Sequence, residues 1–208
     1  MKIDVVSDVI CPWCFLGKRR LDKALTLIPE AKPEVTFRPF FLDPSIPPQG
    51  LSRAEYMKSK FGNRDLKAMH QPLVDAGARD GVPYHFEKIT RTPNTLNAHR
   101  LIRWALQASK QAQVVEALFC AYWRDGKDVG AIDVLAEIAS TCGMDGPEVL
   151  RLLAMPTDAK EVMEEVQKAY ELGVQGVPTF IIDQRYGISG AQEAETLADA
   201  IRQVAAKT

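Results

Sequence analysis

Long apolar runs and a strong charge of either sign are both missing from this chain of 208 residues. No stretch approaches the roughly 18 uninterrupted apolar residues of a membrane-spanning helix, and no basic segment followed by an apolar one opens the chain. The 26 basic and 27 acidic residues leave a net charge of -1. Because nucleic acids and anionic membranes are bound largely through excess positive charge, the sequence argues against either partner. We expect a soluble, cytoplasmic protein.

Cysteine and histidine are scarce, with four and three residues respectively. Four cysteines are too few for a disulfide scaffold in a chain of this length. The composition, 46% hydrophobic and 25% charged, is that of an ordinary globular protein with a core that needs no cross-links. The length suits one large domain or a domain that carries an insertion. In a reducing compartment, two cysteines close together therefore indicate redox or metal chemistry.

The N-terminal segment predicts a strand, a helix and a second strand in succession. Residues 2–8 are rich in β-branched side chains and lead directly into Cys11 and Cys14. From Pro12 to about residue 27, apolar side chains recur at helical spacing, and Pro29 ends the pattern. Residues 34–42 are typical of a strand that lies at an edge or contains a bulge. We expect a βαβ unit that is complete by about residue 42.

The rest of the chain predicts a helical insertion followed by the end of a sheet. Ser52 and Glu55 match a capping box, and Asn94 is expected to cap a further helix. Helical patterns continue near residues 112–124, 131–142, 146–155 and 158–172, before strands at 179–183 and 186–189 and a last helix from residue 193 to the end. The order βαβ, insertion, αββα predicts a discontinuous α/β domain of residues 1–43 and 157–208, with a helical domain of residues 44–156 inserted between its halves.

The cysteine pair has the spacing that dithiol exchange requires. Such a centre needs one exposed, ionised sulfur and a second one close enough to resolve the mixed disulfide that the first one forms. Cys11 would lie at the N-terminus of the first helix, where unpaired backbone N–H groups and the helix dipole favour a thiolate. Cys14 would follow one turn later and face inward. We therefore expect Cys11 to be the attacking sulfur and Cys14 the resolving one.

The two residues between the cysteines carry no charge. Pro12 suits the first helical position, because the N–H that proline lacks would have no partner there. Trp13 offers an apolar wall beside the sulfur. The thiolate would then depend on the helix terminus, with help from Lys18 or Arg19 if the fold brings either one near.

A zinc half-site and a pair of inert core cysteines are the alternatives for Cys11 and Cys14. Zinc needs four ligands, and the other candidates contain no second closely spaced pair. These candidates are Cys120, Cys142, His70, His85 and His99. Inert cysteines rarely occur together between a strand and a helix. Cys120 and Cys142 lie in apolar helical segments, so we expect buried, reduced core residues, with a regulatory second pair as the weaker alternative. No bound metal is expected.

Several motifs in this order resemble the DsbA-like thioredoxin superfamily, in particular its cytosolic FrnE-like branch. They are Cys11-Pro12-Trp13-Cys14, the helical insertion with its stretch at 94–101 (NTLNAHRL), the stretch at 176–180 (GVPTF) and the stretch at 188–192 (ISGAQ). The likeness covers essentially the whole chain. It implies a thioredoxin fold whose Val177–Pro178 bond is cis, in a loop beside the cysteine pair. The Val177 backbone would line the site where a substrate chain lies.

Two departures from related families bear on the reaction. Periplasmic DsbA proteins carry a histidine where Trp13 stands, which argues against a strong oxidant. Kappa-class glutathione transferases and 2-hydroxychromene-2-carboxylate isomerases resemble this architecture but usually carry serine where Cys11 stands. Asn94, His99 and Arg100 form either a helix cap with two solvated side chains or part of a pocket. In a pocket, His99 or Arg100 would steady a thiolate or bind a glutathione carboxylate.

The leading functional hypothesis is a thiol-disulfide oxidoreductase that reduces or isomerises disulfides in a protein or a small thiol compound. The resemblance implies no bound cofactor and makes glutathione a candidate co-substrate. Pro12, Trp13, Val177, Pro178, Asn94 and His99 are the expected substrate contacts. The alternative enzyme is a glutathione-dependent isomerase or transferase of an aromatic or polyketide-like small molecule. A third hypothesis is a non-catalytic binder or chaperone with an apolar groove near Trp13, Phe40 and Phe41.

Overall fold

A four-stranded sheet forms the centre of the computed structural model, which describes residues 1–207. The strands are β1 (Lys2–Ser7), β2 (Glu34–Pro39), β5 (Thr179–Ile182) and β6 (Tyr186–Ser189), in the order β2-β1-β5-β6. β1 is parallel to β2 and antiparallel to β5, which is in turn antiparallel to β6. The predicted first and last parts of the sheet therefore pair through β1, although 139 residues separate the end of β2 from the start of β5 in sequence.

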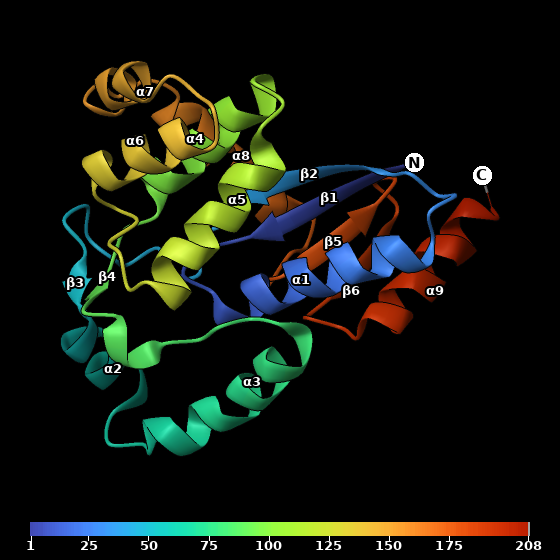
Figure 1. Ribbon diagram of the computed structural model, residues 1–208, viewed down its shortest axis with the longest axis horizontal. Coiled ribbons are helices and arrows are strands. Elements are labelled where there is room, and N and C mark those ends of the chain that lie inside the picture. The colour runs from blue at the N-terminus through green and yellow to red at the C-terminus, as the bar shows by residue number, and fades with distance from the viewer. Residues whose placement is uncertain (208) are drawn as a thin grey trace.

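Helices cover both faces of this sheet. α1 (Pro12–Leu27) and α9 (Ala194–Ala205) pack against each other on one face, and α8 (Ala159–Glu171) lies behind the other (Figure 1). β1 alternates accordingly, because successive side chains of a strand point to opposite faces. Val5 belongs to the large core under α1, whereas Val6 packs with Phe40, Ala169 and Val174 on the α8 side. The last helix was predicted to run to the end of the chain, but α9 ends at Ala205. Thr208, the last residue of that prediction, lies outside the described residues.

The segment between β2 and α8 is helical, with one short ribbon. Its elements are β3 (Leu51–Ser52), α2 (Arg53–Phe61), α3 (Leu66–Asp80), a 3-10 turn (Phe86–Lys88), β4 (Arg91–Thr92), α4 (Leu96–Gln107), α5 (Gln111–Phe119) with a π-helical turn (Cys120–Arg124), α6 (Ile132–Thr141) and α7 (Gly146–Leu153). The capping box of Ser52 and Glu55 is confirmed. The β3–β4 ribbon was not predicted, because strands of two residues are too short to show alternation.

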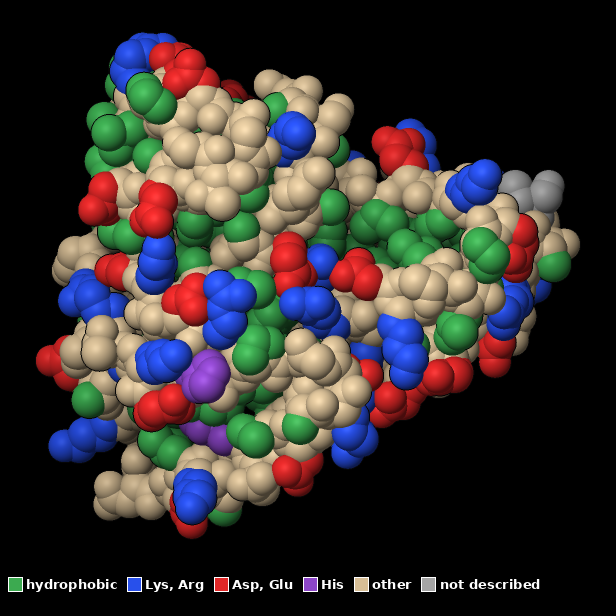
Figure 2. Space-filling model, in the orientation of Figure 1, with side chains coloured by type: hydrophobic (Ala, Val, Ile, Leu, Met, Phe, Trp, Pro, Cys, Tyr) green, Lys and Arg blue, Asp and Glu red, His purple; other side chains and the backbone are tan. Residues whose placement is uncertain are grey.

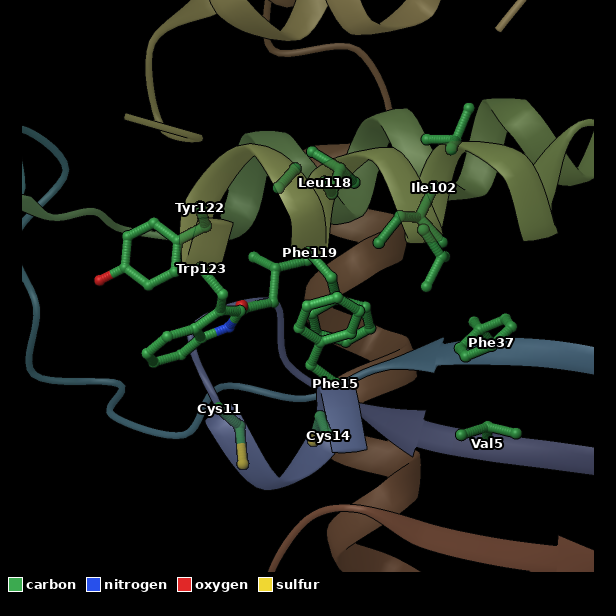
Figure 3. Packing of buried hydrophobic residues seen from close by; sticks show 14 of the residues in the cluster. Val5, Cys11, Cys14, Phe15, Phe37, Ile102, Leu118, Phe119, Tyr122 and Trp123 are labelled. Carbon is green, nitrogen blue, oxygen red and sulfur yellow. The ribbon is translucent and has the colours of Figure 1, made fainter. Parts of the chain in front are cut away.

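The insertion packs on the end of the sheet where α1 begins (Figure 1). The ring of Phe15 in α1 stacks on that of Phe119 in α5, with centroids 5.2 Å apart and planes 8° apart (Figure 3). One buried cluster runs through α1, the sheet and these helices. The insertion therefore shares a core with the sheet at the position of the cysteine pair.

The surface carries both signs of charge. Figure 2 shows Lys and Arg side chains interspersed with Asp and Glu over the visible face, in keeping with the net charge of -1. Within residues 1–207, no helix combines the length and the apolar character that crossing a membrane requires.

Gly17 allows the loop before β5 to approach α1. A Cβ atom at this position would lie 2.8 Å from Pro178 Cγ and 3.3 Å from Phe180 Cζ. We predict that Gly17→Ala lowers the free energy of unfolding by roughly 1 kcal/mol, because overpacking outweighs the gain in helix propensity. Urea unfolding measures the change. Gly187→Ala is the control, since nothing lies within 4 Å of its Cβ position, and an equal loss in both variants would contradict the explanation.

Candidate active site

The cysteine pair lies at the junction between β1 and α1. The Cys11 N–H donates to the Asp8 carbonyl at 3.1 Å, and the Cys14 N–H donates to the Cys11 carbonyl at 3.0 Å. Cys11 is the N-cap residue in an extended conformation, and Pro12 is the first helical residue, as predicted. No side chain caps α1 and its first turn has no acidic residue. The free N–H groups of that turn therefore remain available to a negative charge at the N-cap.

The two thiols are free and close to each other. Burial raises the pKa of the Cys14 thiol, and a hydrogen bond to Cys11 and the charge on Cys11 raise it further. The Cys11 thiol itself donates to the carbonyl oxygen of Val177 at 3.5 Å. Cys14 thus holds its proton beside Cys11, while the backbone of Val177 approaches the first sulfur.

The loop that supplies Val177 has the geometry implied by the family resemblance. The Val177–Pro178 peptide bond is cis. Pro178 is buried where it packs on Gly17, whereas Val177 is half-buried. Thr179 Oγ1 donates to the Gly176 carbonyl at 2.8 Å and closes the turn before β5. The loop and the first turns of α1 therefore enclose the Cys11 sulfur from two sides.

The expected exposure of Cys11 is wrong for this structure. Only 2% of Cys11 is exposed, compared with 44% of Trp13 two residues later. Side chains of the insertion bind the backbone on both sides of Cys11: the Tyr84 hydroxyl donates to the Pro12 carbonyl at 2.6 Å. Trp123 Nε1 donates to the Val9 carbonyl at 3.0 Å, and Figure 3 shows its ring close to the pair. Neither contact has a sequence signature, because both residues are more than 70 positions away from their partners.

A buried carboxylate lies behind the pair. Asp8 is 1% exposed, and its Oδ2 accepts the Leu42 N–H at 2.8 Å. His99 is also buried; its Nε2–H donates to the Phe40 carbonyl at 3.0 Å and lies 3.4 Å from Asp8 Oδ1. His99 was expected to contact substrate, but the structure places it inside the protein as a brace between α4, the end of β2 and the residues that precede Cys11.

Arg100 does not face the cysteine pair. Its guanidinium group donates to four backbone carbonyls just beyond and within the end of α7, those of Leu152, Leu153, Met155 and Thr157. Since the last carbonyls of a helix have no partner within it, Arg100 caps α7. Neither alternative describes this residue, because Arg100 is 3% exposed and bonded to these carbonyls, so it is neither solvated nor at the cysteine pair.

Asn94 was predicted to be the N-cap of α4, but it lies one position before the N-cap and stabilises the start of the helix from there. Thr95 is the N-cap, and the Asn94 Oδ1 accepts the N–H of Leu96, the first helical residue, at 3.0 Å. Its Nδ2 donates to the Ile46 carbonyl at 2.9 Å. Asn94 also lines a cavity of about 230 Å³, but neither Cys11 nor Cys14 belongs to the lining. A role in contacting a substrate held at the sulfurs therefore has no support from this placement.

Lys18 and Arg19 are paired with carboxylates. Lys18 Nζ lies 2.7 Å from Asp22 and 2.6 Å from Glu116, and Arg19 lies 2.5 Å from Glu116. The Cys120 thiol donates to the same Glu116 at 3.3 Å. The two cations therefore stabilise the contact between α1 and α5, and in the described residues neither one pairs with Cys11.

The remaining candidates lie outside the site. Cys120 and Cys142 are free thiols, but both are half-buried and not fully buried as expected. Burial raises the pKa of each. In the described part of the chain, no group of three or more His, Cys, Asp or Glu side chains could hold a metal ion. Phe40 is 5% exposed and packs on Tyr170, so it cannot form an apolar groove together with Trp13.

Comparisons with known proteins agree with this architecture. The model of the DSBA-like thioredoxin domain family matches residues 2–202. The protein YwbO of Bacillus subtilis (strain 168) is 29% identical over 200 residues, which cover 96% of this chain and 94% of YwbO. The crystal structure of a probable DsbA oxidoreductase from Streptomyces coelicolor is similar with a TM-score of 0.92 and 31% identity, over 100% of this chain and 91% of that chain. The predicted thioredoxin fold with a helical insertion is confirmed.

Two more distant structures share the fold. The cytosolic disulfide reductase DsbM from Pseudomonas aeruginosa, solved with GSH, has a TM-score of 0.69 at 15% identity over 100% of both chains. A 2-hydroxychromene-2-carboxylate isomerase has a TM-score of 0.72 at 18% identity over 100% of this chain and 97% of that chain. At these identities the likeness concerns the fold alone.

The brace formed by His99 can be tested through stability. We predict that His99→Ala lowers the free energy of unfolding by about 2 kcal/mol, because the Phe40 carbonyl loses its buried donor and Asp8 loses the imidazole 3.4 Å away. Urea denaturation followed by circular dichroism measures the loss. In the control, His85→Ala, the side chain is 41% exposed, and we expect a change within about 0.5 kcal/mol. An undiminished stability of the His99 variant would mean that the brace contributes nothing.

Proposed function

Because this chain belongs to the family of DSBA-like thioredoxin domains, we propose that it is a thiol-disulfide oxidoreductase with Cys11 and Cys14 as its exchange centre. The observation that supports this most directly is the arrangement of the two free thiols at the start of α1. The Cys11 sulfur lies at the N-cap, against the Val177 carbonyl, and Cys14 lies beside it with a raised pKa. Such a pair supplies one sulfur for attack and one for resolution.

The reaction proceeds through two exchanges. The Cys11 thiolate attacks one sulfur of a disulfide, forms a mixed disulfide and releases the other half as a thiolate. Cys14 gives up its proton and attacks the Cys11 sulfur, which forms the Cys11–Cys14 disulfide and releases the second thiolate. The substrate disulfide gains two electrons and the enzyme loses two. Two thiol equivalents, for which glutathione is the candidate co-substrate, reduce the enzyme again and become glutathione disulfide.

Reduction or isomerisation is the proposed direction, and the cytoplasm is the proposed compartment. A glutathione pool poised near about -250 mV keeps most exchange centres reduced. The half-buried free thiols of Cys120 and Cys142 suit a reducing compartment, because unpaired thiols oxidise readily elsewhere. The partner is then a disulfide-containing protein or a small disulfide, with Trp13 and the Val177–Pro178 loop beside the attacked bond.

The glutathione-dependent isomerase or transferase remains the competing enzyme. The 2-hydroxychromene-2-carboxylate isomerase described above has the same fold as this chain. That reaction needs no second sulfur, whereas here Cys14 forms a hydrogen bond with Cys11. The placement of Cys14 therefore favours redox chemistry, and the behaviour of a Cys14 variant separates the two activities.

The two sulfurs have different roles, which substitution can reveal. We predict that Cys11→Ser abolishes reduction of insulin and glutathione disulfide, whereas Cys14→Ser forms a covalent adduct at Cys11 that mass spectrometry detects. Cys142→Ser, which removes a half-buried thiol in another part of the chain, should retain full activity. Full activity of both active-site variants would refute the proposal. Glutathione-dependent isomerase activity that survives in Cys14→Ser would select the alternative.

The second exchange should depend on pH. Burial, the largest cause of the raised Cys14 pKa, persists in the mixed disulfide, although the charge on Cys11 is lost there. A raised pKa keeps the thiol protonated at neutral pH, so we predict a resolution rate that rises about tenfold per pH unit until the pH reaches that pKa. Release of thionitrobenzoate from a preformed Cys11 adduct measures this rate by absorbance. A rate that does not change between about pH 6 and 9 would show that Cys14 deprotonation is not limiting.

A further inference from the structure

Tyr84 connects the helical insertion to the backbone of the cysteine motif. It belongs to residues 82–88, which follow α3 and which we call the Tyr84 strap. Its hydroxyl donates to the carbonyl oxygen of Pro12, the residue next to Cys11, at 2.6 Å. Among residues 1–207, no other side-chain hydrogen bond joins the insertion to Pro12 or Trp13. The strap is therefore attached at the point that a substrate disulfide must approach.

Aromatic rings hold the Tyr84 side chain in this position. It stacks on Phe86, with centroids 5.5 Å apart, and meets Phe15 and Trp123 edge to face at 6.1 and 5.8 Å. The ring also lies directly on Gly77 of α3, where a Cβ atom would be 2.7 Å from two ring carbons. The His85 N–H donates to the Trp123 carbonyl at 2.8 Å and fixes the backbone of the strap.

The phenol and the sulfurs lie close enough to influence each other. Burial raises the pKa of Tyr84 well above its usual value, and the charges on Cys11 and Cys14 raise it further. The hydroxyl therefore remains a donor at neutral pH. Burial, followed by the charges on Asp43, Asp8 and Cys11, raises the pKa of Tyr56 in α2 to about 12. The Cys11 sulfur thus lies against the Val177 carbonyl, and only 2% of Cys11 is exposed.

We propose that Tyr84 determines substrate specificity by restricting access to Cys11, so that small local movements admit disulfides of small thiols, whereas disulfides of folded proteins require the strap to leave Pro12. This inference rests on the proposed function. A small disulfide needs a path only as wide as its sulfurs and their carbon substituents. A protein disulfide brings its flanking backbone along, so the strap must first leave Pro12. The rate of reaction with the larger substrate is then proportional to the fraction of enzyme whose strap is open.

The test compares two substrates in matched variants. Tyr84→Phe keeps the ring packing and removes only the hydroxyl. We predict that it raises the rate of insulin disulfide reduction about fivefold, the ratio that one neutral hydrogen bond typically supplies, while the rate with glutathione disulfide stays within about twofold. Tyr122→Phe is the control: Tyr122 is fully buried and donates to the Arg91 carbonyl at 3.2 Å, away from the motif. Its two rates should keep the wild-type ratio.

The outcomes distinguish this inference from the proposed function. An unchanged ratio of the two rates in Tyr84→Phe would overturn the specificity role, even with both reactions intact. A parallel fall of both rates would also overturn it, because the hydroxyl would then serve only the structure. A wild-type enzyme that reduces neither substrate would refute the oxidoreductase itself. Alkylation of Cys11 by iodoacetamide and by a bulky maleimide gives the same comparison without turnover. Tyr84→Phe should react faster than the wild type only with the bulky maleimide.

Discussion

The contact between the start of α1 and the Val177–Pro178 loop is the constraint on which the site depends. Gly17 lets the loop approach, because any larger side chain would meet Pro178. The loop then brings the Val177 carbonyl to the Cys11 sulfur. β1 positions both partners of this contact. It leads into α1 through Cys11, and it pairs with β5, which begins directly after Pro178. The register of one strand pair thus sets the geometry of the reacting sulfur.

The helical insertion completes the site. Phe119 stacks on Phe15, the residue that follows Cys14. Trp123 donates to the carbonyl of Val9, two residues before Cys11, and Tyr84 donates to the carbonyl of Pro12, directly after Cys11. His99 supports the carboxylate that precedes the motif. All four residues come from the predicted insertion of residues 44–156, whose boundaries stay a prediction. The insertion therefore holds the backbone on both sides of the cysteine pair.

The sequence could predict what depends on neighbouring residues. The β-branched run before Cys11, the proline at the first helical position and the capping box at Ser52 each follow from local patterns, and the structure has them. The burial of Cys11 could not be predicted, because the residues that pack around the motif, such as Val177 at Cys11 and Tyr84 at Pro12, are distant in sequence. The role of Arg100 stayed open between two alternatives for the same reason, since its carbonyl partners are more than 50 positions away.

A redox titration of the protein against glutathione and its disulfide tests the central claim most directly. The account predicts a single two-electron transition, with mass spectrometry of proteolytic peptides showing a disulfide between Cys11 and Cys14 on the oxidised side. Cys120 and Cys142 should remain thiols through that transition. The absence of any two-electron transition, or a glutathione adduct that persists on Cys11 while Cys14 stays free, would contradict it.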